Sequence, residues 1–539
     1  MNMPPRQSAT TKQQQDTARP VKPPLSCHQC RRLKRRCDRQ YPCCTLCHQR
    51  RVACDYPHQR KERARRGDRQ TPGEVSLSTT SESARNIIAG AKLLSPSSRL
   101  GRENAHYQLS ELDELDLLAA SFLDPDHFIL AQLESKKKDV GITKTVADLV
   151  GSVSDIQAAA QVFFETIHVW MPIVSKQQFQ QQLLQRLAFQ RAELFVLVLA
   201  MKLCSSRVTV AKSMLYRTTK QFYFDIESSG RFSVQTLQAA ILIAIYELGH
   251  GIYPAAIISV ANCARIGTLI GIDKSLSSWD LMSRVPWIEL EEHRRVWWAI
   301  IILDRFMNLC YPKRYLVTRD PDPESYLPVD DDDWDSGLSK PEHAVTLRLS
   351  SQVHIGRFAR FAHAVPLFSQ ALSRSGEEPH NTAQLRRTIL SLINLGETEG
   401  VTNRVLFCTL NAVSYIAVFV LDSPSSRFDT EDYGRPREEF VSPETISALQ
   451  HAVKVMTRES FESIVHDCEK LSPFLLHMLY KALVACFRMK QNPPAGLDVA
   501  LNIHSLKMAL ERFSSRWLVA GTYLLLAKRQ EVFSLIESP

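Results

Sequence analysis

The sequence predicts two parts of different fold class: a small cysteine-rich module near the N-terminal end, and a large all-α helical domain after it. Seven of the 13 cysteines lie between positions 27 and 54, and the excess positive charge lies in the same region. From about residue 108 onward, apolar residues recur mainly with helical spacing. The apolar share of 44% is ordinary for a globular protein. It excludes a fibrous repeat and a wholly disordered chain.

The charge is distributed unevenly along the chain. Residues 1–70 contain 18 Lys and Arg against 5 Asp and Glu, a net charge of +13, whereas the rest of the chain carries a net charge of −4. Such an asymmetry indicates that one end of the protein contacts nucleic acid or another anionic surface.

Two polar segments flank the cysteine-rich residues 26–56. Residues 1–25 are rich in Gln, Thr and Pro, and we expect a disordered tail there. This tail has no apolar segment of the kind found in secretory signals, so the cysteines are expected to bind metal rather than to form disulfides. Residues 57–107 carry a basic run, Arg60–Arg66, and then a Ser/Thr-rich stretch, a composition typical of a linker.

The cysteines form a duplicated pattern. Two half-sites of the form C-x2-C-x6-C are joined by six residues, and their members are Cys27, Cys30, Cys37, Cys44, Cys47 and Cys54. Structural zinc takes four tetrahedral ligands, so six thiolates fill one site with two to spare, or two sites if two sulfurs bridge both metals. The duplication favours two zinc ions per chain. It predicts a metal-stapled module, because about 30 residues cannot bury enough apolar surface to fold alone.

Three further side chains in this segment are candidate ligands. Cys43 directly precedes Cys44, but its use would change the second half-site to C-x3-C, so we expect Cys44 to be the ligand. His28 and His48 each follow a ligand cysteine directly, where joint ligation is awkward, and six thiolates already complete the count. We expect both histidines to be exposed.

The segment resembles the fungal zinc binuclear cluster DNA-binding domain. The family pattern is C-x2-C, a basic run, C, a short loop with a proline, C-x2-C and a final C. This chain supplies each element, with Asp38 after the third cysteine and Pro42 in the loop. The resemblance implies that the first and fourth cysteines, Cys27 and Cys44, bridge the two zinc ions. The chain departs from the family at Leu33, where a basic residue is common, and this bears on how many DNA contacts the first helix makes.

The resemblance also implies how the module binds double-stranded promoter DNA. The run RRLKRR after Cys30 is expected to form a short helix whose C-terminal end enters the major groove at a CGG-type triplet. Lys34 is assigned the base contact, because basic side chains commonly donate to guanine O6 and N7. Phosphate contacts, which position without specifying, are assigned to Arg31, Arg32, Arg35 and Arg36.

Residues 108–539 are predicted to form one all-α domain. Two long loops are expected at 317–343 and 422–444. The acidic run Asp330–Asp333 in the first is interpreted as a solvated loop, with a metal site as the alternative. Helical spacing predicts helices at 155–170, 176–188, 192–204, 234–248, 255–270, 291–310, 344–373, 380–395, 401–421, 444–465, 473–489 and 498–529.

Two of these helices prompt specific expectations. In the segment EEHRRVWWAIIILDRF the apolar residues Trp297, Trp298, Ile301 and Ile302 are expected in the core. Ion pairs, on the helix surface or buried, are expected for Arg294, Arg295, Asp304 and Arg305. The apolar stretch Val405–Leu421 is expected to be a buried core helix with no membrane contact, because a membrane span needs roughly 20 predominantly apolar residues.

Residues 155–335 resemble the fungal-specific transcription factor domain, the middle homology region of the same family. The resemblance implies a domain that regulates activity, by sensing a metabolite or by holding the protein inactive, and that meets the transcription machinery or co-regulators. It rests on the order and spacing of VFFETIHVWMPIVSKQQF (162–179), SVQTLQAAILIAIYELGHG (233–251), ANCARIGTLIGID (261–273) and EEHRRVWWAIIILDRF (291–306).

Together these features predict a nuclear, sequence-specific transcription factor for RNA polymerase II. On family grounds alone, activation is expected rather than repression, and a secondary-metabolite gene cluster is the expected target. The basic run Arg60–Arg66, together with residues 31–36, also fits a bipartite nuclear-import signal. Many family members dimerise through a coiled coil after the cluster, but residues 57–105 show no heptad run, so a homodimer stays an open alternative.

The sequence agrees less well with two other classes of function. An enzyme is not expected, because the sequence contains no G-x-x-x-x-G-K-[ST], H-E-x-x-H, G-x-S-x-G or G-x-G-x-x-G motif. The alternative is a zinc-dependent protein-interaction or scaffold protein without sequence-specific DNA binding. Zinc sites of that kind usually use eight ligands and do not need a run such as RRLKRR.

Overall fold

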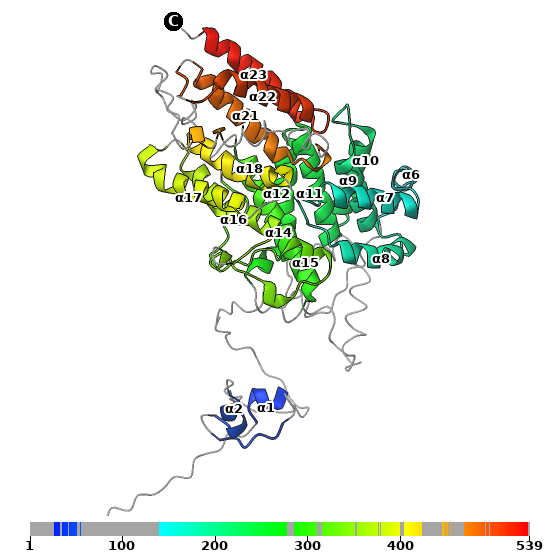
Figure 1. Ribbon diagram of the computed structural model, residues 1–539. Helices are drawn as coiled ribbons and strands as arrows, with labels where there is room; N and C mark the ends of the chain where they lie inside the picture. Colours follow the sequence, from blue (N-terminus) through cyan, green and yellow to red (C-terminus); the bar gives the residue numbers. More distant parts are fainter. Residues whose placement is uncertain are drawn as a thin grey trace, which may run out of the picture. The chain divides into compact units, whose positions relative to one another are not determined.

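The protein is described from a computed structural model (Figure 1). The chain divides into two compact units, Met1–Ser81 and Glu82–Pro539. The structure describes residues 26–32, 35–40, 43–50, 54, 140–277, 285–309, 315–350, 353–375, 377, 379–398, 404–422, 445–447, 449–450, 453, 468–490, 492–494 and 496–536.

The predicted fold class is confirmed. The N-terminal unit holds a cysteine cluster, and within the ranges given above the second unit contains helices but no strand beyond one isolated bridge, Tyr326 to Thr346. The predicted boundaries of the tail, linker and helical domain stay predictions. Residues 1–25 and 55–139 lie outside the described residues.

The N-terminal unit contains two short helices, α1 (His28–Arg32) and α2 (Thr45–Gln49), which contact each other. Among the described residues of this unit, four cysteines form the buried cluster, with partly buried Leu46 and further cysteines packed around them. An apolar core of that size cannot hold a chain segment folded, so the sulfur cluster must do so.

The second unit is built from helices. Its short 3-10 helices are η3 (Ile272–Leu276), η4 (Pro341–His343) and η6 (Cys468–Lys470). In the part of the unit that the structure describes, the α-helices are α6 (Lys144–Val150), α7 (Val153–Glu165), α8 (Lys176–Ala188), α9 (Ala192–Ser205), α10 (Met214–Ser228), α11 (Val234–Gly249), α12 (Ala255–Leu269), α14 (Trp287–Met307), α15 (Asp331–Asp335), α16 (Arg357–Ser373), α17 (Pro379–Thr398), α18 (Arg404–Leu421), α21 (Pro473–Arg488), α22 (Val499–Phe513) and α23 (Val519–Ile536).

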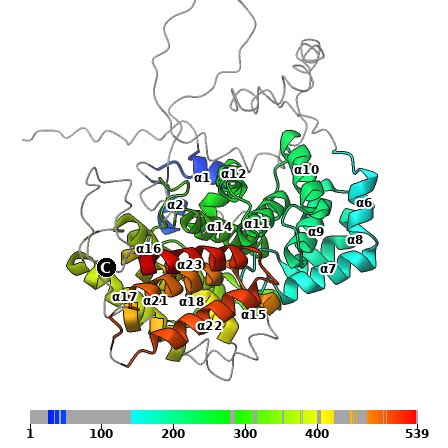
Figure 2. The ribbon, with the colours of Figure 1, turned by 90° about the horizontal axis from the view of Figure 1, so that it is seen from above.

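Helix α11 lies at the centre of this unit. Every residue from Thr236 to Gly249 is buried, and the helix packs against α9, α12 and α14. Figures 1 and 2 show α6 to α9 on one side and α16 and α17 on the other, with α11 and α14 between them. A helix that is apolar all round is a core helix, and its sequence LQAAILIAIYELG agrees with that position.

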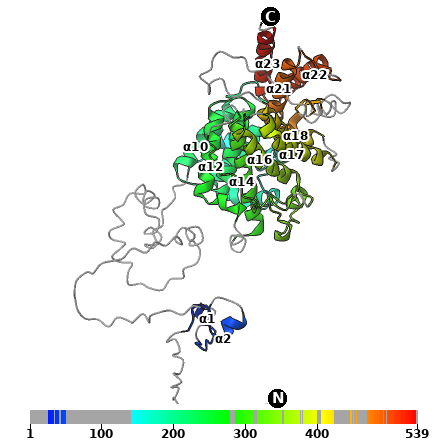
Figure 3. The same ribbon diagram turned by 90° about the vertical axis from the view of Figure 1, so that its left-hand side faces the viewer.

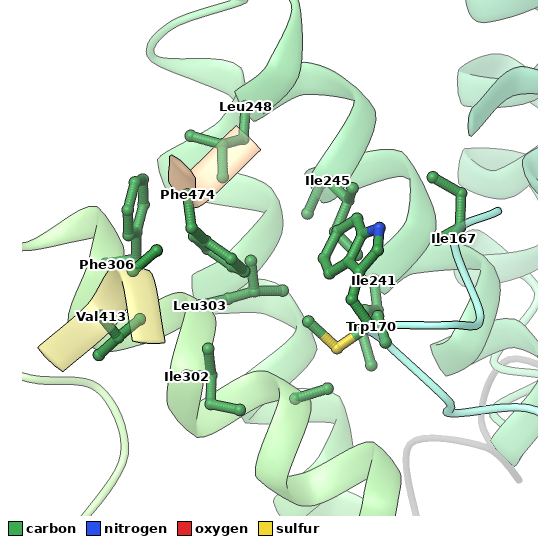
Figure 4. Close-up of a cluster of buried hydrophobic side chains, with 14 of the residues drawn as sticks. Ile167, Trp170, Ile241, Ile245, Leu248, Ile302, Leu303, Phe306, Val413 and Phe474 are labelled. Atoms are coloured by element: carbon green, nitrogen blue, oxygen red, sulfur yellow. The ribbon is translucent and has the colours of Figure 1, made fainter. Parts of the chain in front are cut away.

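The three C-terminal helices α21, α22 and α23 lie together, next to α18 (Figure 3). Helix α21 inserts its first turn into the core. Phe474 contacts Phe306 edge-on at a ring-centroid distance of 4.6 Å and Trp170 at 5.9 Å. Figure 4 shows these aromatic rings from three distant chain segments beside Ile241 and Leu303. The core therefore joins the beginning, middle and end of this unit.

Three described α-helices of this unit were not predicted from the sequence: α6, α10 and the short α15, which lies in the loop expected at 317–343. Helix α10 buries Tyr216, Phe222, Tyr223 and Ile226 along one face. Its apolar face is largely aromatic and is interrupted by polar residues, so the helical spacing is weak in the sequence. The helix predicted at 155–170 is also too long at its C-terminal end, since α7 covers Val153–Glu165.

Two other predicted helices are wrong in extent. The segment predicted as one helix at 498–529 is two, because Arg516 and Trp517 turn into the core between α22 and α23. The Arg516 guanidinium donates to the Cys204 carbonyl at 2.5 Å, and the Trp517 indole donates to the Leu471 carbonyl at 2.8 Å. The predicted helix at 344–373 begins only at Arg357, because Leu347 and Val345 hydrogen-bond to the preceding loop instead.

The interpretation of the acidic run Asp330–Asp333 as a solvated loop is wrong in part. Asp330 caps the short helix α15 by accepting the amides of Asp332 and Asp333 at 3.0 and 3.2 Å. Asp331 is buried, and its carboxylate accepts from the Arg295 guanidinium at 2.6 Å. Asp332 is exposed. The charge pattern of the sequence alone does not show that one of these four aspartates, Asp331, pairs with the buried Arg295.

The expected core and ion pairs of α14 are confirmed, and the pairs are buried. Trp297, Trp298, Ile301 and Ile302 are buried. Glu291 bridges Arg294 and Arg295 at 2.7 and 2.9 Å, with all three side chains fully buried. Arg305 is fully buried as well and pairs with Asp304 and Asp320. Buried charges of this kind need partners, because an uncompensated charge in the interior is costly.

Helix α18 contains the long apolar stretch of the sequence. Its residues from Ala412 to Leu421 are buried, and it packs against α16, α17 and α21. Within the described part of the chain, none of the helices has the length and apolar character that crossing a membrane requires.

Candidate metal centre and nucleic-acid interface

The duplicated cysteine spacing folds into duplicated local geometry. In each half the first cysteine precedes a short helix, and its sulfur accepts the amide of the cysteine three residues on. The Cys30 amide donates to Cys27 Sγ at 3.4 Å, and the Cys47 amide donates to Cys44 Sγ at 3.4 Å. A C-x2-C pair on a first helical turn thus presents both sulfurs on one side, as the spacing predicts.

The six predicted ligand sulfurs come together in two overlapping groups of four. Within each group all four sulfurs lie within 4.8 Å of one another, and Cys27 and Cys44 belong to both groups. The first group adds Cys30 and Cys37, and the second adds Cys47 and Cys54. Two shared sulfurs raise six thiolates to the eight bonds that two tetrahedral zinc ions need.

Sulfur separations fit the same metal. Cys27 Sγ lies 3.8 Å from the sulfurs of Cys37, Cys44 and Cys47, and Cys30 Sγ lies 3.6 Å from that of Cys44. A tetrahedral zinc with bonds of about 2.3 Å to sulfur separates its ligand sulfurs by about 3.8 Å. The donor set, its spacing and its count therefore suit zinc.

The pKa values of the buried thiols indicate that a cation is needed to stabilise them as thiolates. Burial raises the pKa of the Cys30 thiol to about 12, and it raises that of Cys27 as well. For Cys37, burial acts in the same direction but is outweighed by hydrogen bonds from the backbone of Cys27 and Arg39, so its pKa is lowered to about 7. Metal ligands must be thiolates, and bound zinc supplies the charge that stabilises them.

The other candidate ligands lie outside both groups. Cys43 is half-buried and its sulfur points to the Cys44 carbonyl at 3.6 Å. His28 and His48 are exposed. This arrangement supports the choice of Cys44 over Cys43, and the residue-by-residue assignment of the ligands stays a prediction.

Asp38 joins the two halves of the cluster, a role that sequence analysis did not find. Its two carboxylate oxygens both lie 3.2 Å from the Thr45 amide, and the Thr45 hydroxyl also donates to this carboxylate. These hydrogen bonds lower the pKa of Asp38. The side chain that follows Cys37 therefore holds the first turn of α2.

The basic run follows the first C-x2-C pair, and its described arginine side chains are exposed. Arg31, Arg35 and Arg36 are exposed. Helix α1 ends at Arg32, whose side chain lies outside the described residues, as does the whole of Lys34. The predicted helix over 31–36 is therefore too long. The Arg35 amide donates to the Cys30 carbonyl at 2.9 Å, five residues back, and Arg35 and Arg36 are not helical.

Comparison with known proteins agrees with both parts of the chain. Residues 25–63 match the family model described as the Fungal Zn(2)-Cys(6) binuclear cluster domain, and residues 160–393 match the Fungal specific transcription factor domain. The chain belongs to the fungal zinc binuclear cluster transcription factors. The cofactor prediction is confirmed at the level of the domain, since a domain of this family binds two zinc ions.

The chain is similar to fungal proteins that are named as transcription factors or transcriptional activators. It is 32% identical over 153 residues to "Transcription factor BOA15" of Botryotinia fuckeliana, covering 28% of this chain and 85% of that protein. It is 24% identical over 329 residues to "Citrinin biosynthesis transcriptional activator mrl3" of Monascus ruber, covering 56% and 61%. It is 30% identical over 186 residues to "Azaphilone cluster-specific transcription factor azaR" of Aspergillus niger, covering 31% and 39%. The alignments span less than two thirds of the last two relatives.

The family assignment confirms the resemblance seen in the sequence and extends it. The match to the transcription factor domain runs to residue 393, past the predicted limit of 335. It thus includes α16 and most of α17, which the sequence motifs alone do not distinguish from ordinary core helices.

Proposed function

We propose that this transcription factor binds CGG-type triplets in promoter DNA in the nucleus and activates transcription by RNA polymerase II. The observation that carries the proposal is that Arg31, Arg35 and Arg36 are exposed while the neighbouring cysteine sulfurs are buried. A metal-held core with an outward-facing basic run has the charge and size to contact one face of a duplex.

Charge supports the proposal at two scales. Locally, the exposed arginines follow the first C-x2-C pair directly. Along the chain, residues 1–70 carry a net charge of +13 while the rest carries −4. The N-terminal unit is therefore attracted to phosphates, and the helical unit has no such attraction.

Within the basic run we propose two roles. Lys34 donates to guanine O6 and N7 in the major groove and selects the sequence. Arg31, Arg32, Arg35 and Arg36 donate to phosphates and fix the register of the module on the duplex. Zinc, bound by the six cysteines, supplies the folding energy that holds these side chains in place.

The names of the relatives support a more specific target. One is named a citrinin biosynthesis activator and another an azaphilone cluster-specific factor. We propose that this chain likewise activates one secondary-metabolite gene cluster, and that its helical unit meets the transcription machinery or a co-regulator. Sedimentation of the DNA complex would give its mass, and so would show whether one chain or a homodimer binds the duplex.

The test compares duplexes with and without a CGG triplet, using fluorescence anisotropy on the full chain. Lys34→Ala is expected to weaken binding to the CGG duplex by on the order of 1–3 kcal/mol and to leave binding to a scrambled duplex nearly unchanged. The matched control Arg36→Ala is expected to weaken both equally and to reduce the salt dependence, since it removes a phosphate contact.

Equal affinity of the unaltered protein for CGG and scrambled duplexes would contradict sequence-specific recognition. It would favour the alternative, a zinc-dependent protein-interaction module. A normal preference for CGG that survives Lys34→Ala would instead move the base contact to another residue of the run.

A further inference from the structure

A cavity of about 520 Å³ lies among α10, α11 and α12 of the helical unit. Its volume is within the range of about 300–1,000 Å³ that is usual for small-molecule sites. The DNA-binding module contributes no residue to it, so the proposed function does not use it. Its wall includes Tyr216, Lys220, Tyr223, Phe224, Ile258 and Asn262.

One side of the cavity rests on a buried polar network. Glu247 is fully buried and accepts hydrogen bonds from the Tyr216 hydroxyl at 2.8 Å, the Lys220 ammonium at 2.8 Å and the Ser259 hydroxyl at 2.6 Å. Lys220 also donates to Ser259 at 2.7 Å. An ammonium has three N–H donors, so one remains for a further acceptor. The Lys220 side chain is 37% exposed, and it lines the cavity.

Tyr223 supplies a second polar group to the cavity. Its side chain is 8% exposed and lines the cavity. Its hydroxyl lies near the Glu227 carboxylate but makes no hydrogen bond of ordinary length and angle. Burial, together with the nearby Cys263 and Glu227, raises the pKa of Tyr223, so the phenol keeps its proton at neutral pH. A buried hydroxyl without a partner of ordinary geometry is uncommon and costs stability, which points to an acceptor or donor supplied from outside.

The cavity lining also contains apolar side chains. Phe224 on α10 and Ile258 on α12 are 58% and 56% exposed, although both are large apolar side chains. The buried Ala240 and Ile243 of α11 belong to the lining as well. An exposed aromatic ring and a branched aliphatic side chain beside a cavity suit a flat apolar group.

The charges of the site balance. Lys220 and Arg217 are basic, and Glu227 and Glu247 are acidic, with Glu247 already bound to Lys220. A charged ligand would therefore gain no net attraction, whereas a neutral oxygen can use the spare donors. From these observations we infer that the cavity binds a small uncharged molecule with an aromatic ring system and a carbonyl or hydroxyl oxygen. The oxygen accepts from Lys220 and Tyr223, and the ring lies between Phe224 and Ile258.

The probe for the test is prodan, a neutral naphthalene ketone whose fluorescence shifts to the blue in an apolar site. Titration of the full-length zinc-loaded protein without DNA is expected to show saturable binding. Ile258→Arg, at an exposed position, is expected to abolish that binding by filling the cavity. The matched control Leu501→Arg, at an equally exposed position of α22, is expected to leave it unchanged.

A second variant separates binding from folding. Tyr223→Phe removes a hydroxyl that has no hydrogen bond of ordinary length and angle, so the melting temperature is expected to stay equal or rise, while prodan binding weakens about fivefold. Tyr246→Phe removes a hydroxyl that donates to the Ala211 carbonyl at 2.8 Å. That control is expected to lower the melting temperature and to leave prodan binding unchanged.

Absence of saturable prodan binding, or binding that survives both Ile258→Arg and Tyr223→Phe, would overturn the inference. Tighter binding of naphthalene-2-carboxylate than of prodan would overturn the uncharged class of ligand. None of these outcomes depends on DNA, so a failure here is distinguishable from a failure of the proposed DNA recognition.

Discussion

In the N-terminal unit the arginines Arg31, Arg35 and Arg36 are exposed, whereas in the helical unit Arg294, Arg295 and Arg305 are fully buried and paired with carboxylates. The same side chain thus serves two purposes. In the first unit the arginine charge is available to phosphates. In the second unit it is neutralised by internal ion pairs that join α14 to the segment between α14 and α16.

The interiors of the two units differ in the same way. The N-terminal unit buries cysteine sulfurs and little else among its described residues, while the helical unit buries aliphatic and aromatic side chains from nearly every helix. One unit should therefore depend on metal and the other on apolar packing. Their stabilities should respond to different perturbations.

The largest difference is expected on removal of zinc. A chelator should unfold residues 26–56 and abolish DNA binding, because structural zinc supplies about 10–16 kcal/mol of apparent folding energy. The thermal transition of the helical unit should keep its midpoint in circular dichroism, since apolar packing holds it. Metal analysis before chelation should give two zinc ions per chain. One zinc per chain, or a melted helical unit after chelation, would contradict the comparison.

Single cysteines should rank by their place in the cluster. Cys44 belongs to both groups of four sulfurs, so Cys44→Ser should lower the zinc content below two per chain and abolish DNA binding. Cys43→Ser is the matched control, and it should retain both zinc ions and normal affinity. Zinc content by atomic absorption checks both. The reverse ranking would make Cys43 the ligand.

In the helical unit the buried ion pairs are the sensitive point. Glu291→Gln removes the carboxylate that pairs with fully buried Arg294 and Arg295. It should lower the free energy of unfolding by about 3–5 kcal/mol, because two buried guanidinium groups lose their shared partner. The control Glu324→Gln breaks an exposed pair with Arg348, which should cost less than about 1 kcal/mol. Urea denaturation measures both, and equal losses would mean that burial does not matter here.

A smaller effect is expected where two distant segments meet closely. A Cβ added at Gly249 would lie 2.1 Å from the buried Trp517 ring, whereas one added at Gly141 meets nothing within 4 Å. Gly249→Ala should therefore cost about 1–3 kcal/mol through overpacking, and Gly141→Ala should be near neutral. The melting temperature of the helical unit measures the difference, and DNA affinity should be unchanged by both. A shift in affinity would show that this packing affects the DNA module.

Sequence spacing was most informative where chemistry is local. The two C-x2-C-x6-C half-sites predict the sulfur cluster, because the spacing supplies six nearby thiolates and zinc takes four tetrahedral ligands. The structure then places Cys27 and Cys44 in both groups of sulfurs, as the family resemblance implies. Helices with continuous apolar faces, such as α8 and α11, begin and end close to the expected residues.

Errors arose where distant residues decide local structure. The break between α22 and α23 depends on Arg516 donating to Cys204, more than 300 residues earlier in the chain. The burial of Asp331 depends on Arg295, and the late start of α16 depends on hydrogen bonds to the preceding loop. These partner residues lie far away in the sequence, so the local sequence pattern cannot identify them.

By itself the sequence determined that this protein has a metal-held, basic N-terminal module and a large helical body. Both follow from residue types at short, regular intervals, through ligand number in one case and apolar periodicity in the other. The tertiary structure alone decided which charges are hidden and which are presented. It buries the pairs of α14, exposes Arg31, Arg35 and Arg36, and leaves the Tyr223 hydroxyl without a partner of ordinary geometry beside a cavity. Burial and pairing depend on what packs against a side chain, and that is settled only when distant helices meet.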